Sequence, residues 1–265
     1  MDDRAEERID GPWPVLELRR YTLHPGRRDE LAALFEAEFI ESQERLQLRV
    51  LGHFADRDRP DQFVWLRGFR DMEQRRRGLE AFYDGPVWAG HGAAANATMI
   101  DSDDVLLLRP VSADTALRPR PPGERDAVTP VGFVLAATIH LEPGSAPGPA
   151  HRVAEGLLAV LEREKAGILG LYQTEPATNT FPRLPVRADR VVVVFAATLT
   201  AADQDAAAHA VRCWSASGPA AGNARVDLAT LVPLRRSTLD GMARRMAGRG
   251  SPSPQLDRQD DADQG

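Results

Sequence analysis

The sequence predicts an α+β fold in which two tandem ferredoxin-like βαββαβ units pack sheet to sheet and close an α/β barrel within one chain. Three observations favour this fold class: a repeat of landmark spacings, the order of strand and helix patterns inside each repeat, and the composition. The 265 residues are 43% hydrophobic and 27% charged, which is typical of a soluble globular protein with enough apolar mass for one large or two ordinary domains.

Two segments of similar length, residues 15–111 and 131–239, share the spacing of their landmarks. Each opens with a strand-like run that ends in a Pro-Gly turn, and a glycine of a Leu-Gly pair follows 27 residues after that proline. Further on, a tryptophan precedes an arginine by 21 residues in both segments. The second segment is longer only in the loop at 175–189. Because loops tolerate insertions, the spacing indicates an internal duplication.

The first segment follows the order strand, helix, strand, strand, helix, strand. Its strands are expected at residues 15–23, 50–55, 63–69 and 105–109. One helix follows the first turn from about residue 27, where apolar residues recur on one face. The second begins at Asp71, a residue type favoured at N-caps, and Gly85 lies beyond its end. This order is the ferredoxin-like split unit, and two such sheets can close face to face around an internal cavity.

The remaining segments are expected to lie outside the two units. Residues 1–13 are polar and predict a disordered N-terminus, and residues 240–265 have little to bury and predict a disordered tail. Residues 112–130 are rich in proline, arginine and small polar residues, which is typical of a linker. The first unit then spans residues 14–111 and the second residues 131–239.

Charge and composition exclude several classes of function. There are 33 Lys and Arg against 39 Asp and Glu, and no half of the chain has the basic excess that nucleic-acid binding needs. The single cysteine excludes an intrachain disulfide, and no two histidines stand at a metal-ligand spacing. The longest apolar run, residues 191–199, is too short to cross a membrane. We therefore expect a cytoplasmic protein with no nucleic-acid partner, no membrane partner and no metal.

The opening run of the first segment has the pattern ELR-Y-L-PG over residues 17–26. The third strand carries Trp65, and Phe69, Asp71 and Arg75 stand where the second helix begins. These residues resemble the NIPSNAP family, within the dimeric α/β-barrel superfamily. The resemblance is close over the first segment and faint over the second. Related barrels include cofactor-free monooxygenases, cyclases, isomerases and haem enzymes, so the resemblance implies a cavity and leaves its chemistry open.

Alternation along a strand divides its residues between two faces. We expect the apolar sets, Leu16 with Leu18 and Val64 with Leu66, to lie under the helices. The other face would then point into the barrel. It carries the following residues of the first three strands: Glu17, Arg19, Tyr21, His53, Phe63, Trp65, Arg67 and Phe69.

The duplication can be used to find the counterparts of these residues in the second segment. It aligns Arg19 with Ala137, His53 with Leu171 and Trp65 with Phe195. The cavity is therefore expected to have a polar wall and an apolar wall, an arrangement that orients an amphipathic or aromatic ligand. The structural alternative is that Glu17 forms an ordinary ion pair with Arg19 or Arg67, and that the aromatic residues are core residues.

The first functional hypothesis is a cofactor-independent oxygenase, isomerase or cyclase that acts on an aromatic or polyketide-like small molecule of secondary metabolism. His53 or Glu17 would be the general base, and Arg19, Arg67 and Tyr21 would stabilise the enolate or phenolate. The residues expected to contact the ligand are Trp65, Phe63, Phe69, Trp88, His91 and Phe195. His91 is placed in a small-residue loop at the mouth of the barrel.

Two other functions stay open. One is a haem enzyme on the same fold, with a histidine as axial ligand, in place of an enzyme without a cofactor. The other is a non-catalytic protein that binds a small molecule or takes part in an assembly. The duplication predicts that the barrel closes within one chain, and further association into a homodimer is compatible with it.

Overall fold

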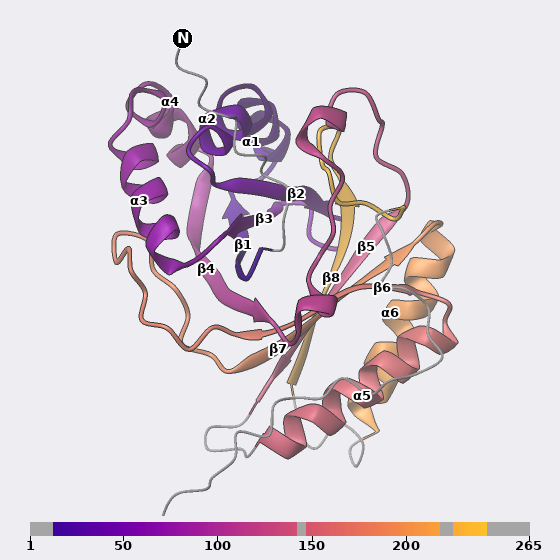
Figure 1. Cartoon of the computed structure of the whole chain (residues 1–265). Helices are drawn as coiled ribbons and strands as arrows, with labels where there is room; N and C mark the ends of the chain where they lie inside the picture. The colour runs from indigo at the N-terminus through magenta and orange to yellow at the C-terminus, as the bar shows by residue number, and fades with distance from the viewer. Residues whose placement is uncertain (1–12, 142–146, 218–224, 243–265) are drawn as a thin grey trace, which may run out of the picture.

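The computed structural model of the chain describes residues 13–141, 147–217 and 225–242, with backbone alone for residues 147–152 (Figure 1). Eight strands form one closed barrel in the order β1-β3-β2-β8-β5-β7-β6-β4. All neighbouring strands pair in antiparallel fashion. The predicted fold class, two ferredoxin-like units closed into an intrachain α/β barrel, is confirmed.

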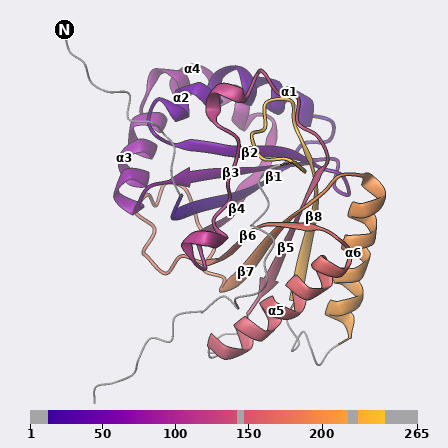
Figure 2. The ribbon, with the colours of Figure 1, turned by 45° about the vertical axis from the view of Figure 1, so that its right-hand side comes forward.

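The two halves of the chain supply four strands each. The first half contains β1 (Val15–Leu23), α1 (Arg28–Leu34), a π-helical segment (Phe35–Phe39), α2 (Ile40–Glu44), β2 (Arg49–Asp56), β3 (Gln62–Phe69), α3 (Met72–Tyr83), α4 (Pro86–Asn96) and β4 (Met99–Pro110). The second half contains β5 (Phe133–His140), α5 (Pro147–Arg163), β6 (Gly167–Thr174), β7 (Val191–Thr198), α6 (Ala201–Ala216) and β8 (Arg225–Pro233). The two units meet at two seams, β2 with β8 and β4 with β6. The helices of each half cover the outside of its own strands, so α1–α4 and α5–α6 lie on different sides of the barrel (Figures 1 and 2).

The second helix of the first unit begins as predicted. The Asp71 side chain accepts a hydrogen bond of 2.6 Å from the backbone N–H of Gln74, which satisfies one of the free donors at the start of α3. The segment after Gly85, expected to be a loop, is instead the helix α4. Pro86 stands in its first turn, where a missing N–H costs nothing, and the alanines that follow favour a helix.

The barrel interior is filled by apolar side chains from both units. Leu16 and Leu18 of β1, Leu66 of β3 and Phe195 of β7 are all buried in this interior core. An eight-stranded barrel is just wide enough for side chains to fill it. The prediction that Leu16 and Leu18 lie under the helices is therefore wrong, and the two cavities described below lie outside the barrel and not in its interior.

The polar set of the first unit faces the helices instead of the barrel interior. Tyr21, Phe63, Trp65 and Phe69 belong to a second core, which packs the outer face of the strands against α1–α4. Alternation separates the two sets of residues correctly, but it does not say which set faces inwards. A buried charged group needs partners, and the outer face offers the side chains of the helices as partners, so the apolar set occupies the interior of the barrel.

The register of the repeat differs by one residue from the predicted alignment in the third strand. Arg19 pairs with Trp65 across β1 and β3, and Ala137 pairs with Val194 across β5 and β7. The counterpart of Trp65 is therefore Val194, on the outer face, whereas Phe195 points into the barrel. A one-residue shift moves a side chain to the opposite face of a sheet.

The segment 112–130, expected to be an unstructured linker, is packed against both units and contains two short 3-10 helices. The backbone N–H of Leu117 donates to the Tyr172 hydroxyl at 2.8 Å. Arg125 is buried and donates to Glu44 Oε1 at 2.6 Å and to the Val50 carbonyl at 3.0 Å. Arg125, which satisfies buried acceptors, thus holds in place a segment whose content of proline, arginine and small polar residues predicted a linker.

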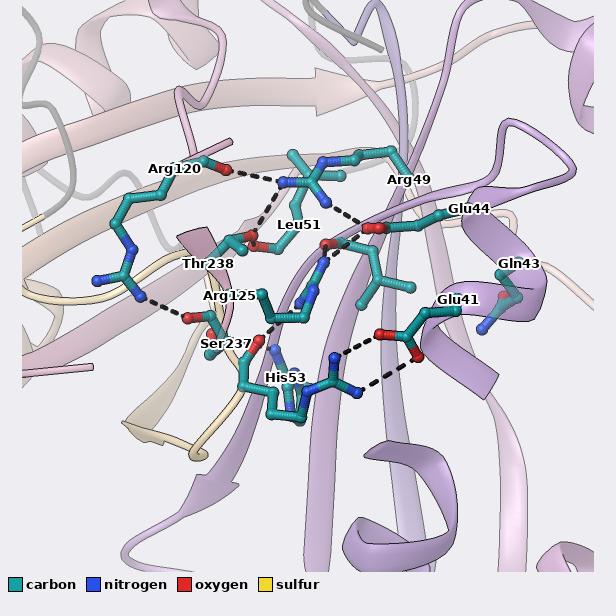
Figure 3. Close-up of polar contacts among 12 residues, drawn as sticks. Glu41, Gln43, Glu44, Arg49, Leu51, His53, Arg120, Arg125, Ser237 and Thr238 are labelled. Atoms are coloured by element: carbon teal, nitrogen blue, oxygen red, sulfur yellow. Dashed lines mark hydrogen bonds and ion pairs between the residues drawn. The ribbon is translucent and has the colours of Figure 1, made fainter. Parts of the chain in front are cut away.

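The chain after β8 is held on β2 by the same network (Figure 3). Thr238 Oγ1 donates to the Leu51 carbonyl at 2.7 Å, and Arg49 donates to the Arg120 carbonyl at 2.8 Å. Asp240, placed by the sequence in a disordered tail, is fully buried and pairs with Arg120 at 3.0 Å. The rest of the predicted disordered ends, residues 1–12 and 243–265, lies outside the described residues.

Candidate functional site

A cavity of about 240 Å³ lies between the outer face of the first unit's strands and its helices. We call it the helix-side cavity. Its lining includes Arg19 and Tyr21 of β1, Trp65 of β3, and aromatic residues of the helical layer: Phe35, Phe39, Phe82, Tyr83 and Trp88. The loop 175–190 of the second unit closes one side with Phe181, Arg183 and Leu184. This is the loop in which the sequence of the second segment carries its excess length.

Behind the cavity wall, one carboxylate contacts three arginines. Glu17 Oε2 lies 2.7 Å from Arg67 Nη2 and 3.1 Å from Arg19 Nη1. Glu17 Oε1 lies 2.7 Å from Arg75 Nη2. All four side chains are at most 1% exposed. These side chains come from two strands, β1 and β3, and one helix, α3, which only the tertiary fold brings together.

The cluster carries more positive than negative charge. Apart from Glu17, the hydrogen-bond partners of Arg67 and Arg75 among the described residues are neutral: Gln43 for Arg67, and Asn179 and Thr180 for Arg75. Three guanidinium groups and one carboxylate leave a net charge of +2 in this buried group. A buried charge without a counterion is costly, so the cluster favours an anion in the adjacent cavity.

The electrostatics of the cluster set the protonation of Glu17. Burial alone would raise the pKa of this carboxyl, but the charges of Arg67, Arg75 and Arg19 outweigh burial and hold the pKa well below its ordinary value. Glu17 is therefore ionised at neutral pH. Because it is buried and already paired with arginines, it is poorly suited to accept a proton from a ligand.

Arg19 connects the cluster to the cavity. Its Nε donates to the Tyr21 hydroxyl at 2.9 Å, and its guanidinium carbon lies 5.6 Å from the centre of the Trp65 ring. Trp65 is buried, and its indole N–H has no hydrogen-bond partner among the described residues. Two lining residues of the cavity, Arg19 and Trp65, therefore carry a permanent cation and a donor that lacks an acceptor.

Tyr83 adds a second hydroxyl to the cavity wall. Burial raises the pKa of Tyr83, so the phenol stays protonated and can donate a hydrogen bond at neutral pH. Its ring meets the Trp88 ring at a centroid distance of 4.6 Å, and Phe35 meets Trp65 at 4.9 Å. These edge-to-face contacts build an aromatic enclosure around the cavity.

The structure brings together some of the predicted site residues and separates others. Arg19, Tyr21, Trp65 and Trp88 line the helix-side cavity, and Glu17 and Arg67 support it from behind. Phe63 and Phe69 are buried in the same core but do not line the cavity. Phe195 lies inside the barrel against Tyr172, so the prediction that it contacts the same ligand as Trp65 is wrong.

The two predicted histidines lie away from the cavity lining. His53 is buried, its Nε2 lies 2.9 Å from Glu36 Oε1, and its ring packs on Phe35. A carboxylate only accepts, so Nε2 carries the proton, and Nδ1 has no partner among the described residues. Burial lowers the pKa of His53 although the contact with Glu36 opposes this. His91 stands on the helix α4 and not in a loop, and its half-buried side chain lies 3.5 Å from Glu38 Oε2.

Sequence reasoning missed several residues of the site. Arg75 was part of the family pattern but was not recognised as the third arginine of the cluster. Phe35 lies on the apolar face of the first predicted helix, and such a face by itself indicates only packing. No sequence pattern singles out Tyr83. Phe181 comes from the other unit, and only its position in an insertion could have drawn attention to it. Among the described residues no cluster of three or more metal-ligating side chains occurs, and no helix could span a membrane.

Comparison with known proteins supports the resemblance found in the sequence. Residues 16–113 match the model of the NIPSNAP family, which confirms the resemblance for the first unit. A NIPSNAP-like domain protein from Burkholderia xenovorans is 27% identical, over 35% of this chain and 81% of its own, with a TM-score of 0.33. A search of curated proteins finds no match to this sequence.

Two solved structures are similar over almost the whole chain. One, from Fusobacterium nucleatum and provisionally named a monooxygenase, has a TM-score of 0.54 and 9% identity, covering 88% of this chain and 98% of its own. The other is an anthrone oxidase-like protein, with a TM-score of 0.54 and 11% identity, covering 89% of this chain and 98% of its own. At such low identity these likenesses establish the shared fold.

Proposed function

We propose that the helix-side cavity is the active site of a cofactor-independent enzyme of the oxygenase, isomerase or cyclase type, acting on an aromatic or compact polyketide-like molecule that binds as an enolate or phenolate. The observation that carries this proposal is the buried Glu17–Arg19–Arg67–Arg75 cluster, whose excess positive charge reaches the cavity wall through Arg19. The names of the two full-length structural neighbours, a provisional monooxygenase and an anthrone oxidase-like protein, agree with it.

The charge of the cluster favours the reactive form of such a substrate. An opposite charge within about 4–6 Å of an acidic group lowers its pKa by about 1–3 units. A phenol or an enolisable ketone next to Arg19 would therefore lose its proton more readily than in water. The anion is the electron-rich form from which oxygenation, isomerisation or cyclisation proceeds, and fixed donors aimed at the developing charge accelerate such steps.

The walls of the cavity fit an aromatic body. Trp65, Trp88 and Phe181 present ring faces and edges, and Tyr83 and Tyr21 add hydroxyl groups. The volume of about 240 Å³ is below the range of about 300–1,000 Å³ that holds drug-sized ligands. We therefore expect a compact substrate of few rings, unless the loop 175–190 moves to enlarge the site.

This mechanism assigns roles that differ from the sequence hypothesis. Arg19 would bind the oxyanion, the Trp65 indole N–H would donate a second hydrogen bond, and Glu17, Arg67 and Arg75 would fix the position and charge of Arg19. Neither His53 nor Glu17 is needed as a base in it, because the cavity lowers the pKa of the substrate itself and water can take the proton. Binding without turnover remains the alternative outcome of the test below.

A haem group does not fit the side chains that are described. Haem enzymes on this fold would use a histidine as axial ligand. No histidine is among the described residues that line the helix-side cavity, and the ring of His53 is buried behind Phe35. We therefore derive no step through haem.

The test uses 4-nitrophenol, whose phenolate absorbs visible light, as a probe of the charge preference. We expect the wild-type chain to lower the pKa of the bound probe by at least about one unit, equivalent to about 1.4 kcal/mol. The variant Arg19→Gln should abolish this shift. Arg77→Gln, which makes the same charge change at an exposed position of α3, should preserve it. A bound probe with an unchanged pKa, or an equal shift in Arg19→Gln, would refute the proposal.

Turnover is tested separately with anthrone and oxygen. We expect oxygen consumption with the wild-type chain and at least a tenfold loss in Arg19→Gln, because the removed charge acts on the substrate anion. If the chain shifts the pKa of nitrophenol but returns anthrone and a wider panel of acidic phenols unaltered, the cavity binds an anion and the enzymatic part of the proposal fails.

A further inference from the structure

A second and larger cavity, of about 590 Å³, lies outside the barrel at the seam where β4 of the first unit pairs with β6 of the second. We call it the seam cavity. Its floor is formed by Leu107 and Arg109 of β4 and by Leu171 and Gln173 of β6. One wall is α5, and the other is the loop 175–190, which lies between this cavity and α3 of the first unit (Figure 1).

Strand geometry explains why apolar and polar floor residues lie side by side. Arg109 and Gln173 are directly paired across the seam, so their side chains share the outward face with Leu107 and Leu171, two residues away on each strand. Leu107 belongs to the helix-side core of the first unit and Leu171 to that of the second. The seam cavity therefore has an apolar floor at one end and a polar pair at the other.

The polar groups of the cavity differ in whether they are already paired. Arg187 lies 2.9 Å from an oxygen of Asp104 and 2.6 Å from one of Asp189. The side chain of Arg109, in contrast, makes no hydrogen bond or ion pair within the described part of the chain. The Gln173 amide beside it is likewise without a side-chain partner there. A guanidinium group and an amide group, both without side-chain partners among the described residues, thus lie next to each other at one end of an apolar cavity.

We propose that the seam cavity is a second ligand site, which binds an amphipathic monocarboxylate. The apolar body of the ligand lies on Leu107, Leu171 and Leu158 of α5, and the carboxylate accepts hydrogen bonds from Arg109 and Gln173. The volume lies inside the range of about 300–1,000 Å³ that is usual for small-molecule sites. Glu155 and Glu175 also line the cavity, and their negative charge disfavours a ligand with more than one negative charge.

This site is independent of the proposed function. Among the described residues, none lines both cavities. The loop 175–190 separates them: its Asn179 lines the seam cavity, and the side-chain oxygen of Asn179 accepts a hydrogen bond from Arg75 at 3.0 Å. A ligand in the seam cavity would therefore contact Asn179, a residue that also holds the cluster behind the helix-side cavity.

The test titrates the full chain with decanoate and with decyl alcohol by isothermal titration calorimetry. We expect decanoate to bind at one site, and Arg109→Gln to weaken it by about tenfold while binding of the alcohol stays within twofold, because the charged hydrogen bond is lost and the apolar contact is kept. Arg118→Gln is the matched control, since Arg118 is exposed, lacks a partner in the described chain and lines neither cavity.

Two further variants locate the bound decanoate. Leu158→Trp places a larger ring in the seam cavity and should abolish binding of both probes, whereas Trp65→Phe alters the helix-side cavity and should leave both affinities unchanged. The proposal is overturned if the wild-type chain does not bind decanoate, if Arg109→Gln binds it as tightly as the wild type, or if Trp65→Phe abolishes binding.

Discussion

The ring of Phe181 lies on the ring of Tyr83 at a centroid distance of 5.8 Å and an angle of 22°. Phe181 belongs to the loop 175–190 of the second unit, and Tyr83 ends α3 of the first. On either side of this stack, Thr180 donates to the Met72 carbonyl at 3.0 Å and Arg183 pairs with Asp84 at 2.6 Å. The insertion that distinguishes the two repeats thus covers the candidate site of the other repeat.

Phe181→Ala should therefore detach this loop and open the helix-side cavity. Phe181 is 4% exposed, and removal of a buried phenylalanine ring costs about 3 kcal/mol of unfolding free energy. We expect a loss of about that size in urea denaturation and faster release of bound 4-nitrophenolate in stopped flow. Arg183→Ala, which removes an exposed ion pair of the same loop, should cost less than about 1 kcal/mol. A loss below about 1 kcal/mol for Phe181→Ala would mean that the loop is not docked in solution.

Glu17→Gln should be among the most damaging conservative substitutions in the chain. Removing one partner of a buried ion pair costs about 3–5 kcal/mol, and here it leaves Arg19, Arg67 and Arg75 without their shared counterion. Urea denaturation at neutral pH measures the loss. The exposed pair of Glu73 with Arg76 provides the comparison, because Glu73→Gln should change stability by no more than about 1 kcal/mol. Equal effects of the two substitutions would show that the buried cluster is not a stabilising unit.

The same carboxyl predicts a loss of stability in acid. The pKa of Glu17 is held below its ordinary value of 4.5, since the three arginine charges outweigh the effect of burial. A lowered pKa gives stability that is present above pH 4.5 and is lost as the pH falls from there towards the folded-state pKa. The slope for one such group reaches about 1.4 kcal/mol per pH unit. In Glu17→Gln this component should be missing, and an unchanged slope below pH 4.5 would contradict the assignment.

The sequence predicted the elements of the first unit well, because their patterns are local. The first strand coincides with Val15–Leu23, and the N-cap Asp71 is where α3 begins. The sorting of Leu16 and Glu17 onto opposite faces was also correct, since it depends only on the two-residue period of a strand. Which face turns into the barrel could not be read from the period.

The candidate site was less predictable because it is assembled from distant residues. Glu17 and Arg75 are far apart in the sequence and meet only when α3 packs on β1. Phe181 reaches the cavity from the second unit, and no local pattern encodes a contact between units. The one-residue shift that exchanged Val194 for Phe195 arose because the alignment matched Asp71 with Ala201, whereas the structure shows that Thr200 is the corresponding N-cap.

His53→Gln tests whether the buried histidine acts on stability alone. Glutamine can keep the donor to Glu36 but does not titrate. Burial lowers the pKa of His53 below 6.5, so the neutral ring stabilises the fold above pH 6.5, and this contribution is lost as the pH falls through the window below that value. We expect the wild type to lose stability in this window and the variant to lack that loss.

The same variant should bind 4-nitrophenolate as the wild type does, because His53 does not line the helix-side cavity. If binding weakens while stability is unchanged, the prediction is wrong and His53 acts on the bound ligand.

Trp65→Phe separates the role of the indole N–H from that of the ring. The buried N–H has no partner among the described residues, which costs about 1–3 kcal/mol, so its removal should offset most of the lost ring contact. We therefore expect unfolding free energies within about 1 kcal/mol of the wild type. Binding of 4-nitrophenolate should weaken about tenfold, since a ligand oxygen would lose this donor beside Arg19.

Trp88→Phe is the control for this prediction. It makes the same change of ring in the lining of the same cavity, but Trp88 is half-buried and its N–H is not among the buried donors that lack a partner. Nitrophenolate binding should weaken less than threefold in this variant, because ring area is lost without loss of an oriented donor. If the two substitutions weaken binding equally, the Trp65 indole N–H does not contact the anion, and Arg19 alone would then carry its recognition.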